Sequence, residues 1–162
     1  MKQIKIPNLS ELIWHEKKFS DLNVESLYQL LRLRSEVFVV EQDCIYQDID
    51  NNDLDATHVY ATKTIEPNAQ VIAYARVLKP EQKYPNASIG RIVTSPNSRG
   101  LGLGKVLVER SMKLCKKLYP NYGITISAQE HLEGFYTSFG FFSDSEIYLE
   151  DDIPHVRMTC SK

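Results

Sequence analysis

Apolar and polar positions follow two kinds of pattern along the chain, helical spacing and short strand-like runs, and these patterns predict the order of the elements. The stretches 23–40 and 103–118 repeat their apolar residues at helical spacing, so both are expected to form amphipathic helices. Asn23 can cap the first of them, because its side chain accepts hydrogen bonds from free backbone N–H groups. Pro120 ends the second helix, since proline cannot continue one.

Short runs rich in Val, Ile, Thr and Tyr predict strands. Three of these runs follow one another in the middle of the chain, and the turn-rich loops between them favour an antiparallel meander. The strand–helix–strand unit over 88–128 instead allows its two strands to run parallel. The expected fold is therefore α/β, a single domain over 1–162 with a mixed, mostly antiparallel sheet and flanking helices. Strands are expected at 11–19, 57–63, 71–78, 88–93, 123–128, 145–150 and 155–160, and a short third helix at 130–140.

Composition narrows the class of protein. The 162 residues are 43% hydrophobic and 25% charged, which suits a globular domain with a core of its own. The net charge of −2 argues against a general nucleic-acid binder, because binding to phosphates needs clustered Lys and Arg. No apolar run reaches the ~18 residues of a membrane span, and the N-terminus lacks a signal-peptide pattern. Three widely spaced cysteines predict no disulfide framework and no metal site, and favour the cytoplasm.

The segment RGLGLGK, residues 99–105, follows a predicted strand and opens the second helix. The first N–H groups of a helix lack internal partners and carry positive partial charge, so this position suits an anion. The glycines let the backbone approach a phosphate closely, and Arg99 and Lys105 add positive charge at either side. The spacing fits neither a P-loop nor the dinucleotide-binding fingerprint, and the expected ligand is a pyrophosphate.

The pattern Arg-x-x-Gly-x-Gly at Arg99, Gly102 and Gly104 resembles the coenzyme A pyrophosphate loop of the GNAT acetyltransferase superfamily. GFYTSFGFF, residues 134–142, resembles the second motif of that family. LRSEVFVVEQDCIYQDID, THVYA, IGRIVTSP and EDDIPHVRM, taken in order with these, resemble its ElaA-like branch over most of the chain. The resemblance implies a GNAT fold, in which a parallel strand pair splays apart, and acetyl-CoA as co-substrate. It implies coenzyme contacts from Ile92, Val93, Thr94, Arg99, Gly100, Leu101, Gly102, Leu103, Gly104, Lys105, Gln129 and Tyr136.

The resemblance also implies direct attack of a primary amine on the thioester within a ternary complex. Tyr136 matches the tyrosine that serves the leaving thiolate, with a purely core aromatic as the alternative. The glutamate that many family members carry on the central strand is missing, because SIGRIV offers only Arg91. Candidates for the general base are instead Glu36, Glu41, His58 and His155. We select His155, whose ordinary pKa suits a base near neutral pH, against the alternative of a structural histidine.

Arg34 lies on the apolar stripe of the first helix, at the i+4 spacing that faces the core. A buried arginine needs a partner, so we favour a structural ion pair that pins the acidic loop 41–56. The alternative is a substrate pocket lined by Arg34, Glu36 and Glu41, with His58 nearby. The loop itself is expected to be solvated, although its carboxylates would also attract a cationic acceptor.

The sequence therefore predicts a cytoplasmic N-acetyltransferase that uses acetyl-CoA to acetylate an amine on a small molecule or a peptide. No nucleic acid, membrane or metal is expected, and a homodimer is compatible with the sequence. Two alternatives stay open. A non-catalytic acyl-CoA sensor would account for the missing carboxylate, and an acyl-homoserine lactone synthase would account for RSEVF at 34–38, although the glycine loop fits that family less well.

Overall fold

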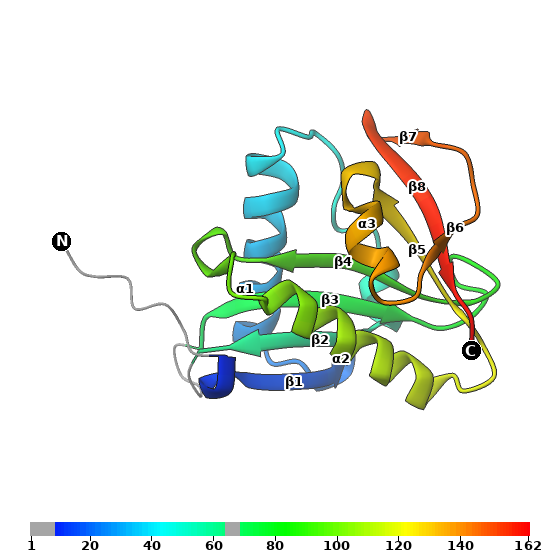
Figure 1. Ribbon diagram of the computed structural model, residues 1–162. Coiled ribbons are helices and arrows are strands. Elements are labelled where there is room, and N and C mark those ends of the chain that lie inside the picture. The colour runs from blue at the N-terminus through cyan, green and yellow to red at the C-terminus, as the bar shows by residue number, and fades with distance from the viewer. Residues whose placement is uncertain (1–8, 64–68) are drawn as a thin grey trace.

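In the part of the chain that the structure describes, an eight-stranded sheet forms the centre, with helices on both of its faces (Figure 1). The computed structural model describes residues 9–63 and 69–162. The order across the sheet is β1-β2-β3-β4-β5-β8-β6, and β7 pairs with β8. The strands are β1 (Ile13–Lys18), β2 (Thr57–Thr62), β3 (Val71–Leu78), β4 (Ala87–Thr94), β5 (Ile124–Gln129), β6 (Phe142–Ser143), β7 (Tyr148–Glu150) and β8 (Ile153–Cys160).

Two long helices cover the sheet from opposite sides (Figure 1). Helix α1 packs on β3 and β4, and helix α2 packs on β2, β3 and β4. The helices are α1 (Val24–Arg34), α2 (Leu103–Leu118) and α3 (Glu133–Thr137), and α1 continues as a π-helical segment, Ser35–Glu41. Short 3₁₀ turns lie at Leu9–Glu11, Phe19–Asp21, Asn52–Asp55, Pro96–Ser98 and Glu130–Leu132.

The helical patterns of the sequence are confirmed. Helix α2 begins and ends at the predicted residues. Asn23 caps α1, because its Oδ1 accepts a hydrogen bond of 2.7 Å from the backbone N–H of Ser26. The first helix differs in one respect: after Arg34 the α-helical bonds give way to the wider π-helical pattern, which periodicity alone does not distinguish.

The described strand pairs are antiparallel except β4 with β5, so the mixed, mostly antiparallel sheet is confirmed. The β2–β3–β4 meander pairs as expected. Strand β6 was not predicted, because two residues carry no periodic signal. Two cores result: Leu103 and Leu107 of α2 pack against one face of the sheet, while Leu30 and Leu33 of α1 pack around Tyr74 on the other.

A cluster of charged side chains lies on the α1 face of the sheet. Arg34 is fully buried there, and its Nε donates to Asp48 Oδ2 at 2.8 Å and its Nη1 to Asp53 Oδ1 at 2.7 Å. Both aspartates are themselves buried. The structural ion pair expected for Arg34 is therefore present, with partners from the loop. We call the full set the Arg–Asp cluster; its members are Arg34, Arg76, Arg91, Asp48, Asp50 and Asp53.

Two further arginines tie the same segment to the sheet. Arg76 of β3 bonds both oxygens of Asp50, at 2.5 and 2.7 Å, and Arg91 of β4 donates from Nε to Asp48 at 2.6 Å. The expectation of a solvated loop over 41–56 is therefore wrong for Asp48, Asp50 and Asp53, whereas Glu41, Asp43 and Asp55 are exposed. The three clustered aspartates are neutralised by arginines from three separate elements, which local charge counting could not reveal.

No helix within residues 9–63 and 69–162 is long and apolar enough to cross a membrane. The same residues hold no group of three or more His, Cys, Asp or Glu side chains that could hold a metal ion. Cys44, Cys115 and Cys160 are free, buried thiols.

Replacing Arg34 by Met should destabilise the fold strongly, because Asp48 and Asp53 would lose a buried partner. We expect a loss of about 3–5 kcal/mol in the free energy of unfolding, measured by urea denaturation. The matched control is Arg32→Met. That variant removes an exposed ion pair with Glu36 and should cost no more than about 1 kcal/mol. Equal losses in the two variants would contradict a stabilising role for the cluster.

Candidate active site

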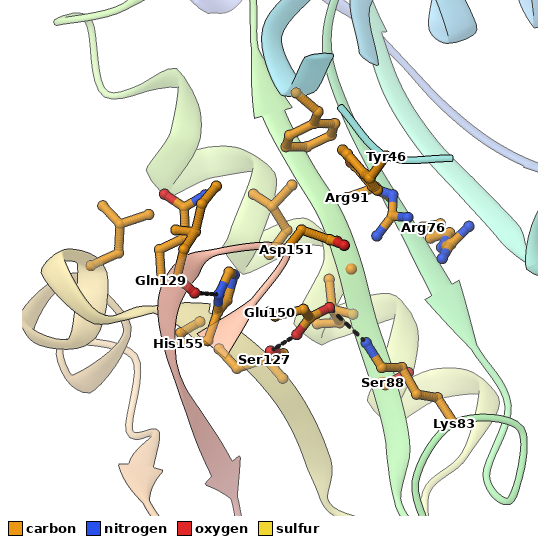
Figure 2. Close-up of a pocket in the computed structure, with 18 of the residues that line it drawn as sticks. Tyr46, Arg76, Lys83, Ser88, Arg91, Ser127, Gln129, Glu150, Asp151 and His155 are labelled. Carbon is orange, nitrogen blue, oxygen red and sulfur yellow. Dashed lines mark hydrogen bonds and ion pairs between the residues drawn. The ribbon is translucent and has the colours of Figure 1, made fainter. Parts of the chain in front are cut away.

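Strands β4 and β5 run side by side at one end and then separate. Their parallel pairing is limited to Ala87 with Ile124 and Ser88 with Thr125. Beyond Ser88 the facing edge of β4 has no ladder partner on β5, and a cavity of about 420 Å³ opens between and beside the two strands. Figure 2 shows residues of β3, β4, β5 and the β7–β8 hairpin around it. The splayed parallel pair is therefore confirmed.

A β-bulge shapes the β4 wall of this cavity. Tyr74 and Arg76 of β3 pair with Val93 and Gly90, so β4 carries one extra residue at this point. Arg91 lies in the bulge with a φ of 52°, in the left-handed region. Its guanidinium reaches the Arg–Asp cluster and lies 5.5 Å from the ring centre of Tyr46. The central strand thus offers the cavity a cation that already has partners, and no carboxylate.

Tyr136 of α3 lines the cavity with its hydroxyl unengaged. The ring packs edge-on against Phe135 and Phe141, at centroid distances of 5.1 and 6.1 Å. The hydroxyl has no hydrogen-bond partner among the described residues. Burial raises the pKa of Tyr136 to about 12. The residue is therefore a core aromatic that lines the cavity and keeps its phenol protonated near neutral pH.

His155 of β8 lines the same cavity. Its Nδ1 lies 2.7 Å from the carbonyl oxygen of Ile153, which can only accept a hydrogen bond. Nδ1 therefore carries the hydrogen of the neutral ring, and Nε2 carries the lone pair. The ring stacks on Tyr148 at 6.3 Å between centroids. A neutral His155 can thus accept a proton at Nε2 without losing the bond that orients it.

Glu150 of β7 is a cavity residue that the sequence analysis missed. Its Oε2 accepts a hydrogen bond of 2.5 Å from Ser127 Oγ, and Lys83 Nζ lies 3.8 Å from its Oε1 (Figure 2). Burial works against ionisation of Glu150, but the Ser127 hydrogen bond and the Lys83 charge outweigh it and hold its pKa below the usual value. The sequence shows the acidic turn after β7, EDDIP, but no local pattern places Glu150 at the cavity. In the structure, Asp151 and Asp152 of this turn have φ angles of 51° and 63°. Two such residues are typical of a tight hairpin turn.

The glycine loop lies beyond the C-terminal end of β4 (Figure 1). None of its residues lines the cavity. Gly100 and Gly102 have φ angles of 78° and 77°, which other residues rarely adopt. Gly102 occupies the N-cap position of α2, so the N–H groups of the following first turn have no partners within the helix. The backbone here is shaped as an anion site requires.

Arg99 and Lys105 flank this loop as cations near the surface. Arg99 forms a two-pronged ion pair with Glu41, at 2.8 and 3.1 Å, and both side chains are well exposed. Glu41 therefore contacts the predicted coenzyme loop and not the cavity. Such an exposed pair is weak, so an incoming phosphate can compete for Arg99.

The other predicted coenzyme residues fall along the gap and the helix. Ile92 and Gln129 line the cavity, and the Gln129 side-chain amide donates to Gln42 Oε1 at 3.3 Å across the gap. Val93 and Leu103 are buried, so only their backbone groups can meet a ligand. The remaining members, Thr94, Leu101 and Gly104, are half-buried.

The residues proposed to bind the acceptor lie away from the cavity, and this expectation is corrected. Arg34 and His58 are fully buried. His58 Nε2 donates to the Asp53 carbonyl at 3.0 Å and Nδ1 lies 2.9 Å from the Tyr74 hydroxyl, so both nitrogens are occupied. Burial lowers the pKa of His58, which keeps it neutral. Glu36 pairs with Arg32 outside the cavity. None of the four therefore contacts a ligand in the cavity.

A family model described as an acetyltransferase (GNAT) domain matches residues 18–162. The chain therefore belongs to the GNAT acetyltransferase family, which implies acyltransferase chemistry with an acyl-CoA.

Protein ElaA of Escherichia coli (strain K12) is 42% identical over 147 residues, which span 90% of this chain and 94% of that protein. The crystal structure of Escherichia coli ElaA has a TM-score of 0.84 at 39% identity, covering 93% of this chain and 99% of that one. An acyl-CoA N-acyltransferase from Pseudomonas aeruginosa has a TM-score of 0.85 at 43% identity, with the same coverage. The resemblance to the GNAT fold and to the ElaA-like branch is confirmed.

A spectroscopic titration tests the placement of Tyr136. Because burial raises its pKa to about 12, wild type and Tyr136→Phe should ionise the same number of phenols between about pH 9 and 11. Ultraviolet difference spectra measure this number, and circular dichroism at each pH checks that the fold persists. One phenol fewer in the variant over that range would place the Tyr136 hydroxyl in water.

Proposed function

We propose that the protein transfers an acetyl group from acetyl-CoA to a primary amine by direct attack in a ternary complex. The observation that carries the proposal is the cavity between the separated β4 and β5, with Tyr136, whose hydroxyl is unengaged, among the residues that line it. Membership of the GNAT family supports the acyl-CoA. The acetyl group, the amine acceptor, the single domain over 1–162, the cytoplasmic location and the homodimer stay predictions.

The coenzyme is proposed to lie along the gap and end at the α2 N-terminus. The pantetheine arm would pair with the free β4 edge at Ile92, Val93 and Thr94, as an added strand does. The pyrophosphate would meet the backbone from Gly100 to Lys105, with Arg99 released from Glu41 to bind it. Gln129 and Tyr136 would contact the arm from the opposite wall.

The reaction needs a base for the amine, a donor for the oxyanion and a donor for the departing sulfur. His155 Nε2 takes a proton from the acceptor ammonium, and the neutral nitrogen attacks the carbonyl carbon. A backbone N–H near Val93 stabilises the oxyanion. The tetrahedral intermediate then collapses: its C–S bond breaks, its nitrogen releases a second proton, and the thiolate takes up one proton, so an ammonium and a thioester yield an amide, a thiol and one proton.

The magnitude of the Tyr136 pKa decides its part in this step. A thiol has an ordinary pKa of about 8.5, well below the value of about 12 for this phenol. Full proton transfer from Tyr136 to the thiolate is therefore uphill. We propose that the phenol instead donates a hydrogen bond that stabilises the departing sulfur, while solvent supplies the proton.

Release of CoA from acetyl-CoA, measured with polyamines, amino acids, aminoglycosides and lysine peptides, tests the function. Thermal shift with acetyl-CoA alone runs beside it, where ligand at ~100 times its Kd stabilises by ~2.7 kcal/mol. Amine-dependent release supports the transferase, and absence of any stabilisation overturns coenzyme binding.

A non-catalytic acyl-CoA sensor is the second candidate. The observation in its favour is Arg91, which lies in the β4 bulge, on a central strand that carries no carboxylate. A sensor would be stabilised by acetyl-CoA and would release no CoA with any amine.

Replacing Gly102 by Glu should weaken acetyl-CoA binding by about 100-fold or more, because the new carboxylate would repel the pyrophosphate. Space is available, since a Cβ at this position meets nothing within 4 Å. Gly102→Asn is the matched control, because asparagine tolerates the left-handed backbone without adding charge. Calorimetry measures both affinities. An unchanged affinity in Gly102→Glu would remove the loop from the coenzyme site.

Replacing Tyr136 by Phe should lower kcat by about 10- to 100-fold, the usual loss for one hydrogen bond to a charged group. Binding of acetyl-CoA should change far less, because the ring packing is kept. Steady-state kinetics and calorimetry separate the two effects. Phe135→Leu, which alters the neighbouring ring only, serves as the control. Equal turnover in wild type and Tyr136→Phe would leave Tyr136 as a core residue.

A further inference from the structure

The cavity continues from the β4–β5 gap onto the face of the sheet that carries the Arg–Asp cluster. Ser127, Glu150 and Asp151 line this part from β5 and the β7–β8 hairpin, and Lys83 lines it from the loop before β4 (Figure 2). Tyr84 of the same loop is also a lining residue. None of these residues belongs to the proposed coenzyme site. This half of the cavity is therefore open to the second substrate.

The ion pairs of the lining show which charges are left for a ligand. Arg76 and Arg91 also line the cavity, but both are neutralised by the aspartates of the Arg–Asp cluster. Among the described residues, Glu150 forms an ion pair with Lys83 alone, at 3.8 Å, and Asp151 forms none. The lining thus keeps one negative charge in excess, which favours a cation.

Hydrogen bonds fix the carboxylate of Glu150 in the cavity lining, where such a cation could bind it. Ser127 Oγ donates to its Oε2 at 2.5 Å and also lies 2.6 Å from the Tyr148 hydroxyl, which fixes the serine. This arrangement engages Oε2 and leaves Oε1 toward Lys83. The hairpin itself is anchored, since Cys44 Sγ lies 3.5 Å from the carbonyl oxygen of Asp151.

Lys83 shows what kind of group this carboxylate accepts. Its Nζ is a primary alkylammonium, and it lies 3.8 Å from Oε1 and 5.4 Å from the ring centre of Tyr84. The distance to Oε1 is too long for a hydrogen bond, and the lysine is partly exposed. A substrate ammonium at hydrogen-bond distance can therefore displace it at little cost.

We infer that Glu150 binds the ammonium group of the acceptor and selects an unbranched alkylamine with no carboxylate beside its nitrogen. This inference rests on the proposed transferase function. Glu150 pairs with Ile153 across the hairpin, and His155 lies two positions further along β8. The carboxylate would hold the ammonium, and His155 would take its proton. An α-carboxylate on the acceptor would be forced against Glu150 and Asp151, and like charges at such range repel.

Binding of n-pentylamine to the protein saturated with CoA tests the inference without any chemistry. We expect Glu150→Gln to weaken this binding by about 10- to 100-fold in calorimetry, because the amide cannot form a charge-assisted bond. Glu146→Gln is the matched control, since Glu146 is exposed and outside the cavity. Norleucine, which is n-pentylamine with an added α-carboxylate, should bind wild type more weakly than n-pentylamine. Spermidine and Nα-acetyl-lysine methylamide then distinguish a polyamine from a peptide as the source of the alkylamine.

A second variant guards against misfolding of Glu150→Gln. Lys83→Met keeps the stem and removes the competing ammonium, so n-pentylamine should bind it more tightly than wild type. Equal affinity for n-pentylamine in wild type and Glu150→Gln, or norleucine binding as tightly as n-pentylamine, would overturn the inference, as would a failure of wild type to bind either amine. The two proposals fail separately. Amine-dependent CoA release with an unchanged KM in Glu150→Gln removes only the role of Glu150, whereas amine binding without any release removes only the transferase.

Discussion

Arg34 carries its positive charge in the interior of the molecule, and the neighbouring structure depends on how that charge is balanced. A buried guanidinium is tolerated only when counter-charges and hydrogen bonds surround it. Asp48 and Asp53 supply them from a segment with little regular secondary structure, which is thereby held against the sheet. Asp48 also holds Arg91 at the bulge of β4. The buried ion pairs therefore fix the position of Arg91 and of the β4 bulge that lines the cavity.

The bulge and the short β4–β5 pairing leave a gap that is bordered by two different parts of the chain. On one side, the free edge of β4 leads to the N-terminus of α2, where Gly102 gives the backbone its left-handed turn. On the other side, the β7–β8 hairpin brings Glu150 and His155 to the cavity. Tyr136 lies on the cavity wall with its hydroxyl unengaged. A thioester lying in the gap would be reached from both regions.

Local patterns in the sequence were enough to predict most of the elements, but not β6 or the π-helical end of the first helix. The bounds of α2 and the cap at Asn23 follow from interactions within a few residues, and the burial of Arg34 follows from its place on an apolar stripe. Glu150 could not be found in this way, because its position depends on a hairpin that folds back across β5. The pairing of Arg99 with Glu41 joins residues 58 positions apart, and no local pattern encodes it.

The β7–β8 hairpin has a consequence for how this protein can diverge. It contributes Glu150, Asp151 and His155 to the cavity, yet among the described residues its two strands pair only with β5, with β6 and with each other. The segment that meets the coenzyme in our proposal lies elsewhere in the chain. In our proposal, a few substitutions in this hairpin would therefore change which acceptor binds and leave the binding of the acyl donor intact. The hairpin could then be exchanged between relatives, or grafted by design, as one unit.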